Sequence, residues 1–144
     1  MTIPQLSVFM ENRAGQLAEI TSALAENNID LRAINIAETS DYGVLRIIAD
    51  QPRLAAQVLS EKGFVVSVTP VIAVTVHDQP GGLSRALCVM AEENIDIEYM
   101  YSVFGQHNGD AFMIFRVEDD EKLAAVLIAA GYTVATGSDI GIKA

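Results

Sequence analysis

The stretch that decides the fold is SVFMENRAGQLAEITSALAENNIDL, residues 7–31, because the chain contains a second version, AVTVHDQPGGLSRALCVMAEENIDI, at residues 73–97. Setting Gly15 under Gly81 aligns the two copies at an offset of 66 residues (81 − 15 = 66). The identical pairs include Val8 with Val74, Leu17 with Leu83, Ala25 with Ala91, Glu26 with Glu92, Asn28 with Asn94, Ile29 with Ile95 and Asp30 with Asp96. So dense a match at one offset indicates an internal duplication.

The repeat continues to the end of each half of the chain. AAQVLSEKGFVV at residues 55–66 falls under LAAVLIAAGYTV at residues 123–134, at an offset of 68 residues (131 − 63 = 68). The second copy therefore has a two-residue insertion in its middle. We predict two units of similar length, residues 1–69 and residues 70–144.

Each unit shows the same order of predicted elements. β-Branched and aromatic residues before the turn indicate a strand, and apolar residues at helical spacing after it indicate a helix. Two strands joined as a hairpin follow, then a helix that ends at a glycine suited to a left-handed cap, then a short strand. Apart from the first helix of each unit, which follows the turn, the predicted elements are residues 3–10, 29–38, 44–50, 52–63 and 64–68 in unit one. In unit two they are residues 70–76, 95–104, 111–118, 120–131 and 132–136. Strand, helix, strand, strand, helix, strand is the ferredoxin-like order, so we predict an α+β fold with helices on one face of antiparallel sheets.

The junction between the units leaves almost no linker. The last predicted strand of unit one runs through Pro70 into the first strand of unit two. We therefore expect a rigid pair, in which the two sheets have the option of joining edge to edge. The remaining sheet edges favour a homodimer, because an unpaired strand edge invites association.

Composition excludes several classes of function. A formal net charge of −10 with only nine Lys and Arg argues against nucleic-acid and anionic-membrane partners, both of which need clustered positive charge. The single Cys88 cannot close an intrachain disulfide, and the N-terminus lacks the features of a secretory signal. No apolar run approaches the roughly 20 residues of a membrane helix. We expect a cytoplasmic protein.

The glycine turns before the first helix of each unit are candidate anion sites. The first backbone N–H groups of a helix have no internal partners and carry partial positive charge. The turn offers Gly81, Gly82, Leu83 and Ser84, which is not the Gly-Lys-Ser/Thr of a phosphate loop, and the dinucleotide fingerprint is absent. The remaining alternatives for this turn are a smaller anion, such as the carboxylate of an amino acid, or no ligand at all.

The sequence resembles tandem ACT-domain proteins from Gln5 to about Ala135. MENRAGQL at residues 10–17 and HDQPGGL at residues 77–83 resemble the family's loop after the first strand. The resemblance implies a freestanding, non-catalytic regulatory pair that binds a free amino acid at interfaces between ACT units, without a cofactor or metal. The two units use all of the chain, so no separate catalytic domain is expected.

The resemblance also implies site residues. Asn12 and Gly15 match the loop Asn and Gly that touch the effector, whereas the second unit has Asp78 and Gly81. At a later position where the family often has Asn, both units carry Asp. We expect the ligand carboxylate on the loops and its amino group towards that Asp. The candidates are Asn12, Arg13, Ala14, Gly15, Gln16, Leu17 and Asp30 in unit one, and Asp78, Gln79, Pro80, Gly81, Gly82, Leu83 and Asp96 in unit two, together with Tyr99 and Tyr101 on the strand after Asp96.

Other interpretations stay open. The glycines serve equally well for a tight turn or close packing, and the two Asp residues for capping a turn. Tyr99 and Tyr101 are also suited to packing at an interface. For function, the alternatives are an ACT-type assembly subunit of an amino-acid biosynthetic enzyme such as acetolactate synthase, without its own effector, and a small enzyme using His77 with Asp78 or Asp96. No nucleophile, base and orienting group stand at a recognisable spacing, which argues against the enzyme.

Overall fold

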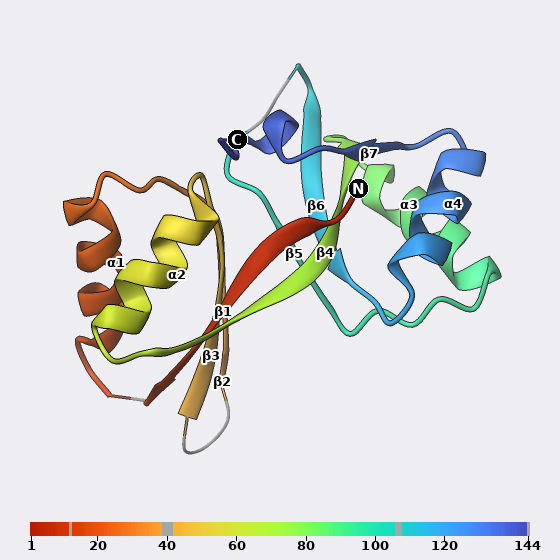
Figure 1. Cartoon of the computed structure of the whole chain (residues 1–144). Helices are drawn as coiled ribbons and strands as arrows, with labels where there is room; N and C mark the ends of the chain where they lie inside the picture. The colour runs from red at the N-terminus through yellow and green to blue at the C-terminus, as the bar shows by residue number, and fades with distance from the viewer. Residues whose placement is uncertain (12, 39–41, 106–107, 144) are drawn as a thin grey trace. The chain divides into compact units, whose positions relative to one another are not determined.

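The computed structural model describes residues 1–11, 13–38, 42–105 and 108–143 (Figure 1). It divides into two compact units. The N-terminal unit consists of Pro4–Thr69 with the residues from Gly141 onward, and the C-terminal unit consists of Pro70–Ile140 with Met1–Ile3. The sequence-based division at residues 69 and 70 placed both chain ends in the unit nearer to them in sequence. In the structure the first three residues and the last few are exchanged between the units.

The N-terminal unit has the predicted order of elements. They are β1 (Ile3–Glu11), α1 (Gln16–Glu26), β2 (Leu31–Glu38), β3 (Tyr42–Ala49), α2 (Pro52–Glu61) and the first part of β4 (Val65–His77). The strands lie in the order β2-β3-β1-β4, and β3 pairs antiparallel with both β2 and β1. Figure 1 shows α1 and α2 next to each other on one side of this sheet.

The C-terminal unit repeats this plan, starting from the second part of β4. Its further elements are α3 (Gly82–Glu92), β5 (Tyr99–Ser102), β6 (Asp110–Arg116), α4 (Asp120–Ala129), β7 (Thr133–Ala135) and a short 3-10 helix (Ser138–Ile140). The strand order is β7-β4-β6-β5, with antiparallel pairing throughout. In both units the fourth strand therefore lies beside the first, followed by the third and the second. This is the ferredoxin-like fold expected from the sequence.

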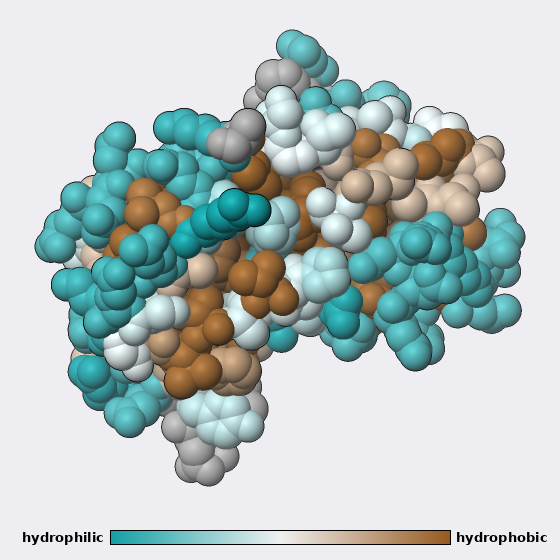
Figure 2. All heavy atoms as spheres, viewed as in Figure 1, coloured by the Kyte–Doolittle hydropathy of each residue, from teal (hydrophilic) through white to brown (hydrophobic). Residues whose placement is uncertain are grey.

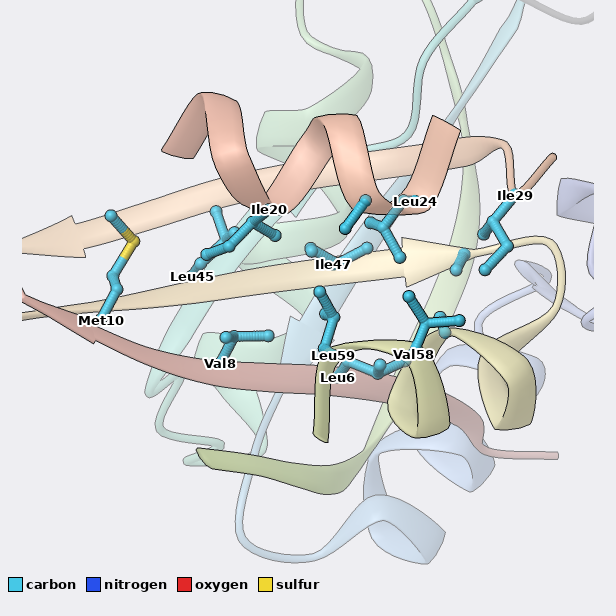
Figure 3. Packing of buried hydrophobic residues seen from close by; sticks show 13 residues of the cluster. Leu6, Val8, Met10, Ile20, Leu24, Ile29, Leu45, Ile47, Val58 and Leu59 are labelled. Carbon is cyan, nitrogen blue, oxygen red and sulfur yellow. The ribbon is translucent and has the colours of Figure 1, made fainter. Parts of the chain in front are cut away.

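Each unit has its own hydrophobic core between sheet and helices. In the N-terminal unit the alternate residues Leu6, Val8 and Met10 of β1 point towards the helices, which contribute Ile20 and Leu24 among others (Figure 3). The second core is likewise formed by strand and helix residues, and its Phe115 is fully buried. Burial of each such side chain contributes about 1.5–3 kcal/mol, so the cores hold each sheet to its helix pair.

The repeated Asn-Ile-Asp sequence ends the first helix of each unit. Asn28 has a φ of 54°, its N–H donates to the carbonyl of Ala25 at 3.0 Å, and the N–H of Ile29 donates to the carbonyl of Leu24 at 3.0 Å. This pair of bonds is a Schellman motif, in which the left-handed residue is Asn and the following apolar residue packs back on the helix. Asn94 at the end of α3 has a φ of 55° and the same bonds. The identity of the two copies here has a structural cause.

Several strand and helix ends differ from the prediction. β5 is Tyr99–Ser102 rather than residues 95–104, because Ile95 and Ile97 pack against the core before the strand begins.

The glycines predicted to follow the second helices do have left-handed backbone, with φ of 92° at Gly63 and at Gly131. The predicted hairpin turn between β5 and β6 has positive φ at Asn108 and Gly109, of 53° and 79°.

Candidate ligand-binding site

The turns before α1 and α3 have the same internal hydrogen bonds. In the first turn the N–H of Arg13 donates to the carbonyl of Glu11 at 2.9 Å. In the second turn the equivalent N–H of Gln79 donates to the carbonyl of His77, also at 2.9 Å. The duplicated sequence therefore builds one turn twice. Asn12, the first predicted contact, lies outside the described residues.

A left-handed glycine precedes each helix and leaves its start uncapped. Gly15 has a φ of 86° and Gly81 a φ of 85°, and each is the N-cap residue of its helix. No described side chain accepts a capping hydrogen bond at either end. The N–H of Gln16 donates to the carbonyl of Arg13 at 3.4 Å and that of Gly82 to the carbonyl of Gln79 at 3.0 Å. The N–H groups that follow them in the first turn of each helix can receive an anion, which the helix dipole also favours. The predicted anion site keeps its physical basis.

Gly82 has a packing role, which is the plain structural interpretation considered above. A Cβ atom at this position would overlap the carbonyl oxygen of His77. Only glycine lets the start of α3 approach the end of β4 so closely. By contrast, no atom of the described residues lies within 4 Å of a Cβ built on Gly15, so among these residues only its positive φ calls for glycine there.

An open pocket of about 500 Å³ lies beside the first turn. Side chains of both signs line it, with Arg13 and Lys62 opposite in charge to Glu11 and Glu19. The guanidinium of Arg13 lies 3.6 Å from a carboxylate oxygen of each of these glutamates, at Nε and Nη2. These pairs are exposed, so they hold Arg13 only weakly and leave it able to exchange its partners. The pocket therefore offers positive and negative groups within one small volume.

Gln16 adds a buried polar group to this pocket. Its side chain lines the pocket, the residue is only 6% exposed, and its Oε1 has no hydrogen-bond partner among the described residues. A buried acceptor without a donor costs about 1–3 kcal/mol. Which of the two amide atoms occupies this place is an assignment, and either one is left needing a polar partner.

The pocket beside the second turn has a different chemistry. It measures about 520 Å³ and is lined by His77, Asp78, Gln79 and Leu83 together with residues around the end of β5, such as Phe104. The imidazole Nδ1 of His77 lies 3.0 Å from Oδ1 of Asp110, its neighbour across the strands. Among the described residues, the lining of this pocket has no Lys or Arg, and the guanidinium of Arg85 lies beside Gly81. The two turns are alike in backbone but not in the side chains around them.

The structure does not bring Asp30 to the turn of its own unit. Asp30 follows Ile29 at the C-terminal end of α1, whereas Gly15 lies at the N-terminal end. Figure 3 shows Met10, from the turn end, and Ile29 at opposite ends of the core. The 11 residues of α1 span about 16 Å, much more than the length of an amino acid. The carboxylate of Asp30 instead accepts a hydrogen bond from Nη1 of Arg32 at 3.0 Å.

Asp96 is separated from Gly81 in the same way. It lies beyond the C-terminal end of α3 and lines another pocket, next to the start of α4. A ligand whose carboxylate lies on a turn therefore does not reach the Asp of the same unit, because the length of the helix separates the two positions. A ligand contact of Asp30 or Asp96 stays a prediction.

Tyr99 and Tyr101 pack together on one face of β5. Their rings are stacked with centroids 6.4 Å apart and an angle of 15° between the planes, and Tyr101 is 8% exposed. Met100, between them, packs against the core on the other face. Neither tyrosine lines the pocket beside the second turn. The packing interpretation describes them better than a ligand contact.

Sequence reasoning missed Lys62, Glu19 and Tyr42 as pocket residues. Lys62 and Tyr42 lie far along the chain from Gly15, whereas Glu19 lies on the helix that Gly15 precedes. The strand order was a signal that would have found Lys62, because the fourth strand of a ferredoxin-like unit starts beside the end of the first strand. Glu19 stands one helical turn after Gly15, on the same side of α1 as the loop.

Comparison with known proteins identifies the family. The model of the ACT domain pair matches residues 1–140. The chain belongs to the ACT-domain-pair family. Membership confirms the resemblance found in the sequence. It also supports a regulatory, ligand-binding role for this ACT pair.

Solved structures share this fold over nearly the whole ACT pair. Protein BT0572 from Bacteroides thetaiotaomicron has a TM-score of 0.90 and 36% sequence identity, with 98% of this chain and 96% of that chain covered. The ligand-free regulatory subunit of aspartate kinase from Thermus thermophilus has a TM-score of 0.64 and 18% identity, with 88% and 91% covered. The corresponding subunit from Thermus flavus has a TM-score of 0.58 and 16% identity, with 89% and 90% covered. At such low identity the likeness to the kinase subunits concerns the fold alone.

A search of curated proteins found no match to this chain. In the part of the chain that the structure describes, no helix is long and apolar enough to cross a membrane, and no group of three or more His, Cys, Asp or Glu side chains is arranged to hold a metal ion.

Proposed function

We propose that this ACT pair is a non-catalytic regulatory protein that binds a free amino acid at the turn before α1. The observation that carries the proposal is the pocket beside Gly15, where an uncapped helix start meets side chains of both charges. A free amino acid is a zwitterion, so it needs a site for an anion and a site for a cation a few ångströms apart. The equivalent pocket of the second unit lacks the cationic side chains and is the weaker candidate.

The ligand carboxylate is received by the first N–H groups of α1 and by the guanidinium of Arg13. Charge-assisted hydrogen bonds of this kind are stronger than neutral ones, and arginine is suited to holding a carboxylate with two parallel bonds. The ammonium group is received by Glu11 or Glu19, which now surround Arg13 at 3.6 Å. Gln16, whose buried amide atom has no partner among the described residues, supplies a further hydrogen-bonding group within the same pocket.

Regulation requires that the ligand favour one arrangement of the protein over another. In this proposal the protein acts as a homodimer, and the bound state is passed on to an enzyme of amino-acid metabolism or a transporter. A contribution from Asp30 to the ligand then has to come from a second copy, because the helix separates Asp30 from the turn of its own unit.

A matched pair of variants tests the site. Arg13→Gln gives the first turn the residue that stands at the equivalent position of the second turn, Gln79, and Gln79→Ala is its control. We expect one or a few of the twenty amino acids to raise the melting temperature of the wild type, as a ligand of the folded state does. Calorimetry should then show an affinity about tenfold or more lower in Arg13→Gln, through loss of a charged contact of about 1.5–3 kcal/mol. The control should bind as the wild type does.

Two results would count against the proposal. If no amino acid shifts the melting temperature at millimolar concentration, the turns are structural. If an amino acid binds with equal affinity to wild type and Arg13→Gln but loses affinity in Gln79→Ala, the site is at the second turn instead.

A further inference from the structure

The last residues of the chain dock on a corner of the N-terminal unit, where β3 leads into α2. The backbone N–H of Lys143 donates to the carbonyl of Asp50 at 2.7 Å, and its Nζ lies 3.3 Å from Oδ2 of the same residue. Two residues earlier, Gly141 lies against the guanidinium of Arg32, so that a Cβ there would be 2.8 Å from Nε. An extended segment with a lysine is therefore held at this corner by backbone and side chain together.

Asp50 is the centre of this corner. It is only 5% exposed, and its other carboxylate oxygen, Oδ1, accepts a hydrogen bond from the backbone N–H of Asp30 at 2.9 Å. The N–H of Asp50 in turn donates to the carbonyl of Asp30 at 2.9 Å. These bonds orient the Asp50 carboxylate so that its Oδ2 faces the ammonium of Lys143.

The internal duplication places an equivalent corner in the C-terminal unit. The offsets of 66 and 68 residues relate Asp30 to Asp96 and Asp50 to Glu118. Asp96 and Glu118 line an open pocket of about 660 Å³, together with Asn94 and the first residues of α4. Asp50 is buried under the docked segment, whereas Glu118 is exposed. The corner that is covered in the first unit is open in the second.

The open corner has more negative charge than the covered one. Arg32 is replaced by Glu98, Gln51 by Asp119 and Arg53 by Glu121 at the equivalent positions. Figure 2, viewed as in Figure 1, shows hydrophilic residues gathered over the region where α4 begins. The corner thus keeps an acidic residue at the position of Asp50 and loses the arginines that stand at positions 32 and 53 of the first unit. Among the described residues, the basic side chains near it are Lys122 and Arg116, whose guanidinium lies 3.6 Å from a carboxylate oxygen of Glu98.

Asp120 gives this pocket an acceptor that lacks a donor. It lines the pocket, and its Oδ1 is buried with no hydrogen-bond partner among the described residues. Burial raises the pKa of this carboxyl above its usual value of 3.8, with the nearby Asp119 and Glu98 acting in the same direction and Arg116 acting against them. A cation bound in the pocket relieves the repulsion among these groups.

We propose that this corner of the C-terminal unit binds an extended, lysine-bearing peptide segment of a partner protein, as the corner around Asp50 binds Gly141–Lys143. The peptide backbone donates to the carbonyl of Glu118, and its ammonium group lies among the carboxylates of Glu118 and Asp96. The chain's own last residues are held by Asp50, so the occupant comes from another protein. The inference goes beyond the proposed amino-acid site, which lies at the opposite end of the first helix of a unit, and does not depend on it.

A synthetic peptide with the sequence GSDIGIKA and an amidated C-terminus is a direct probe. We expect its titration into the full-length, isotope-labelled protein to shift the backbone resonances of residues 94–96 and 117–122. Binding should weaken by about tenfold or more in Glu118→Lys, which reverses the charge of an exposed side chain. It should weaken similarly when glutamine replaces the lysine of the peptide, and also when salt is raised from about 50 to about 500 mM.

Asp50→Asn is the matched control variant in the other unit. It keeps an acceptor for the N–H of Asp30 but loses the charge that faces Lys143, so it should leave peptide binding at the C-terminal unit unchanged. Shifts confined to Asp30 and Asp50 would mean that the peptide merely displaces the chain's own last residues, which overturns the proposal. Binding that is equally tight in wild type and Glu118→Lys overturns it as well. If free lysine binds as tightly as the peptide, the corner is a small-molecule site and not a peptide site.

Discussion

Gly15, Gly81 and Gly82 stand in equivalent turns, yet different physical constraints act on them. Gly15 and Gly81 have left-handed backbone, which costs an ordinary residue about 1–2 kcal/mol. Gly82 has no such backbone, but a side chain there would overlap the carbonyl of His77. A flexible side chain can move away from a new methyl group. The backbone carbonyl of His77, which lies in a strand, cannot move away without distorting the turn.

Substitution of these glycines by alanine should therefore have unequal effects on stability. We expect Gly82→Ala to lower the free energy of unfolding by about 3 kcal/mol, as overpacking of a close backbone contact does. Gly15→Ala should cost only about 1 kcal/mol, because its Cβ meets no atom within 4 Å and only the dihedral is unfavourable. Urea denaturation of the two variants measures both values. Equal losses would show that the backbone dihedral, and not the close approach, decides the use of glycine here.

The sequence did not distinguish these roles at the level of single residues. Positive φ at a glycine before a helix is a common feature and was inferred from the turn. The contact of Gly82 is with a carbonyl five residues earlier, and depends on how closely α3 approaches β4. Likewise, Asn28 and Asn94 belong to the Schellman motifs that end α1 and α3. Their identity in the two copies therefore reflects how the helices end, and not a ligand contact.

At the scale of elements, the start of α4 shows how a helix end changes the titration of a side chain. Asp119 caps the helix by accepting a hydrogen bond from the N–H of Lys122 at 3.0 Å. The next residue, Asp120, has a buried carboxylate oxygen with no hydrogen-bond partner in the part of the chain that the structure describes. Its pKa is raised chiefly by this burial, so the folded protein holds the proton of Asp120 more tightly than the unfolded chain does.

Asp120 should consequently reduce stability at neutral pH. A carboxyl with a raised folded-state pKa leaves stability unaffected below its unfolded value of 3.8 and lowers it as the pH rises through the folded pKa. We expect Asp120→Asn, compared with wild type, to gain stability between about pH 3 and about pH 7, and the exposed control Glu121→Gln to show no such trend. Urea denaturation across this range is the measurement. A stability difference that stays constant with pH would show that Asp120 titrates normally.

Element order was predictable because the duplication repeats every hydrophobic pattern. Two copies of one pattern exclude many alternative interpretations of a short apolar run, and the order of strands and helices was correct in both units. The strand ends were less predictable, since Ile95 and Ile97 have the alternation of a strand but pack on the core before β5 pairs with β6. The pockets could not be predicted from local pattern, because residues such as Lys62 reach Gly15 only through the strand order.

At the scale of the whole molecule, the duplication produces two similar units that differ in what covers them. The sequence predicted that the last residues belong to the second unit, whereas the residues from Gly141 onward lie with the first. No periodicity in GIKA indicates this, because the docking depends on Asp50, which is far away in the sequence. The segment places the ammonium group of Lys143 beside the carboxylate of Asp50 and adds a backbone hydrogen bond to the same residue, so it contributes to the stability of the N-terminal unit.

Removal of the residues after Ile140 should therefore destabilise the protein measurably. The lost interactions include, among the described residues, a backbone hydrogen bond and an ion pair between Lys143, whose side chain is 63% exposed, and Asp50, whose side chain is 6% exposed. Because solvent screens the lysine, we expect a loss of about 1–2 kcal/mol. That loss corresponds to a fall in Tm of about 3–5 °C, which differential scanning calorimetry resolves.

A double-mutant cycle separates the ion pair from other effects of truncation. Lys143→Met should cost stability in the wild type but much less in an Asp50→Asn background, where no charge remains for the lysine to face. Because Asn retains the acceptor for Asp30, this background keeps the turn between β3 and α2 intact. A truncated protein that melts at the wild-type temperature would show that the segment is not bound in solution. The corner around Asp50 would then be open, like the equivalent corner around Glu118. The contact between Lys143 and Asp50 could then no longer serve as the model for peptide binding at Glu118.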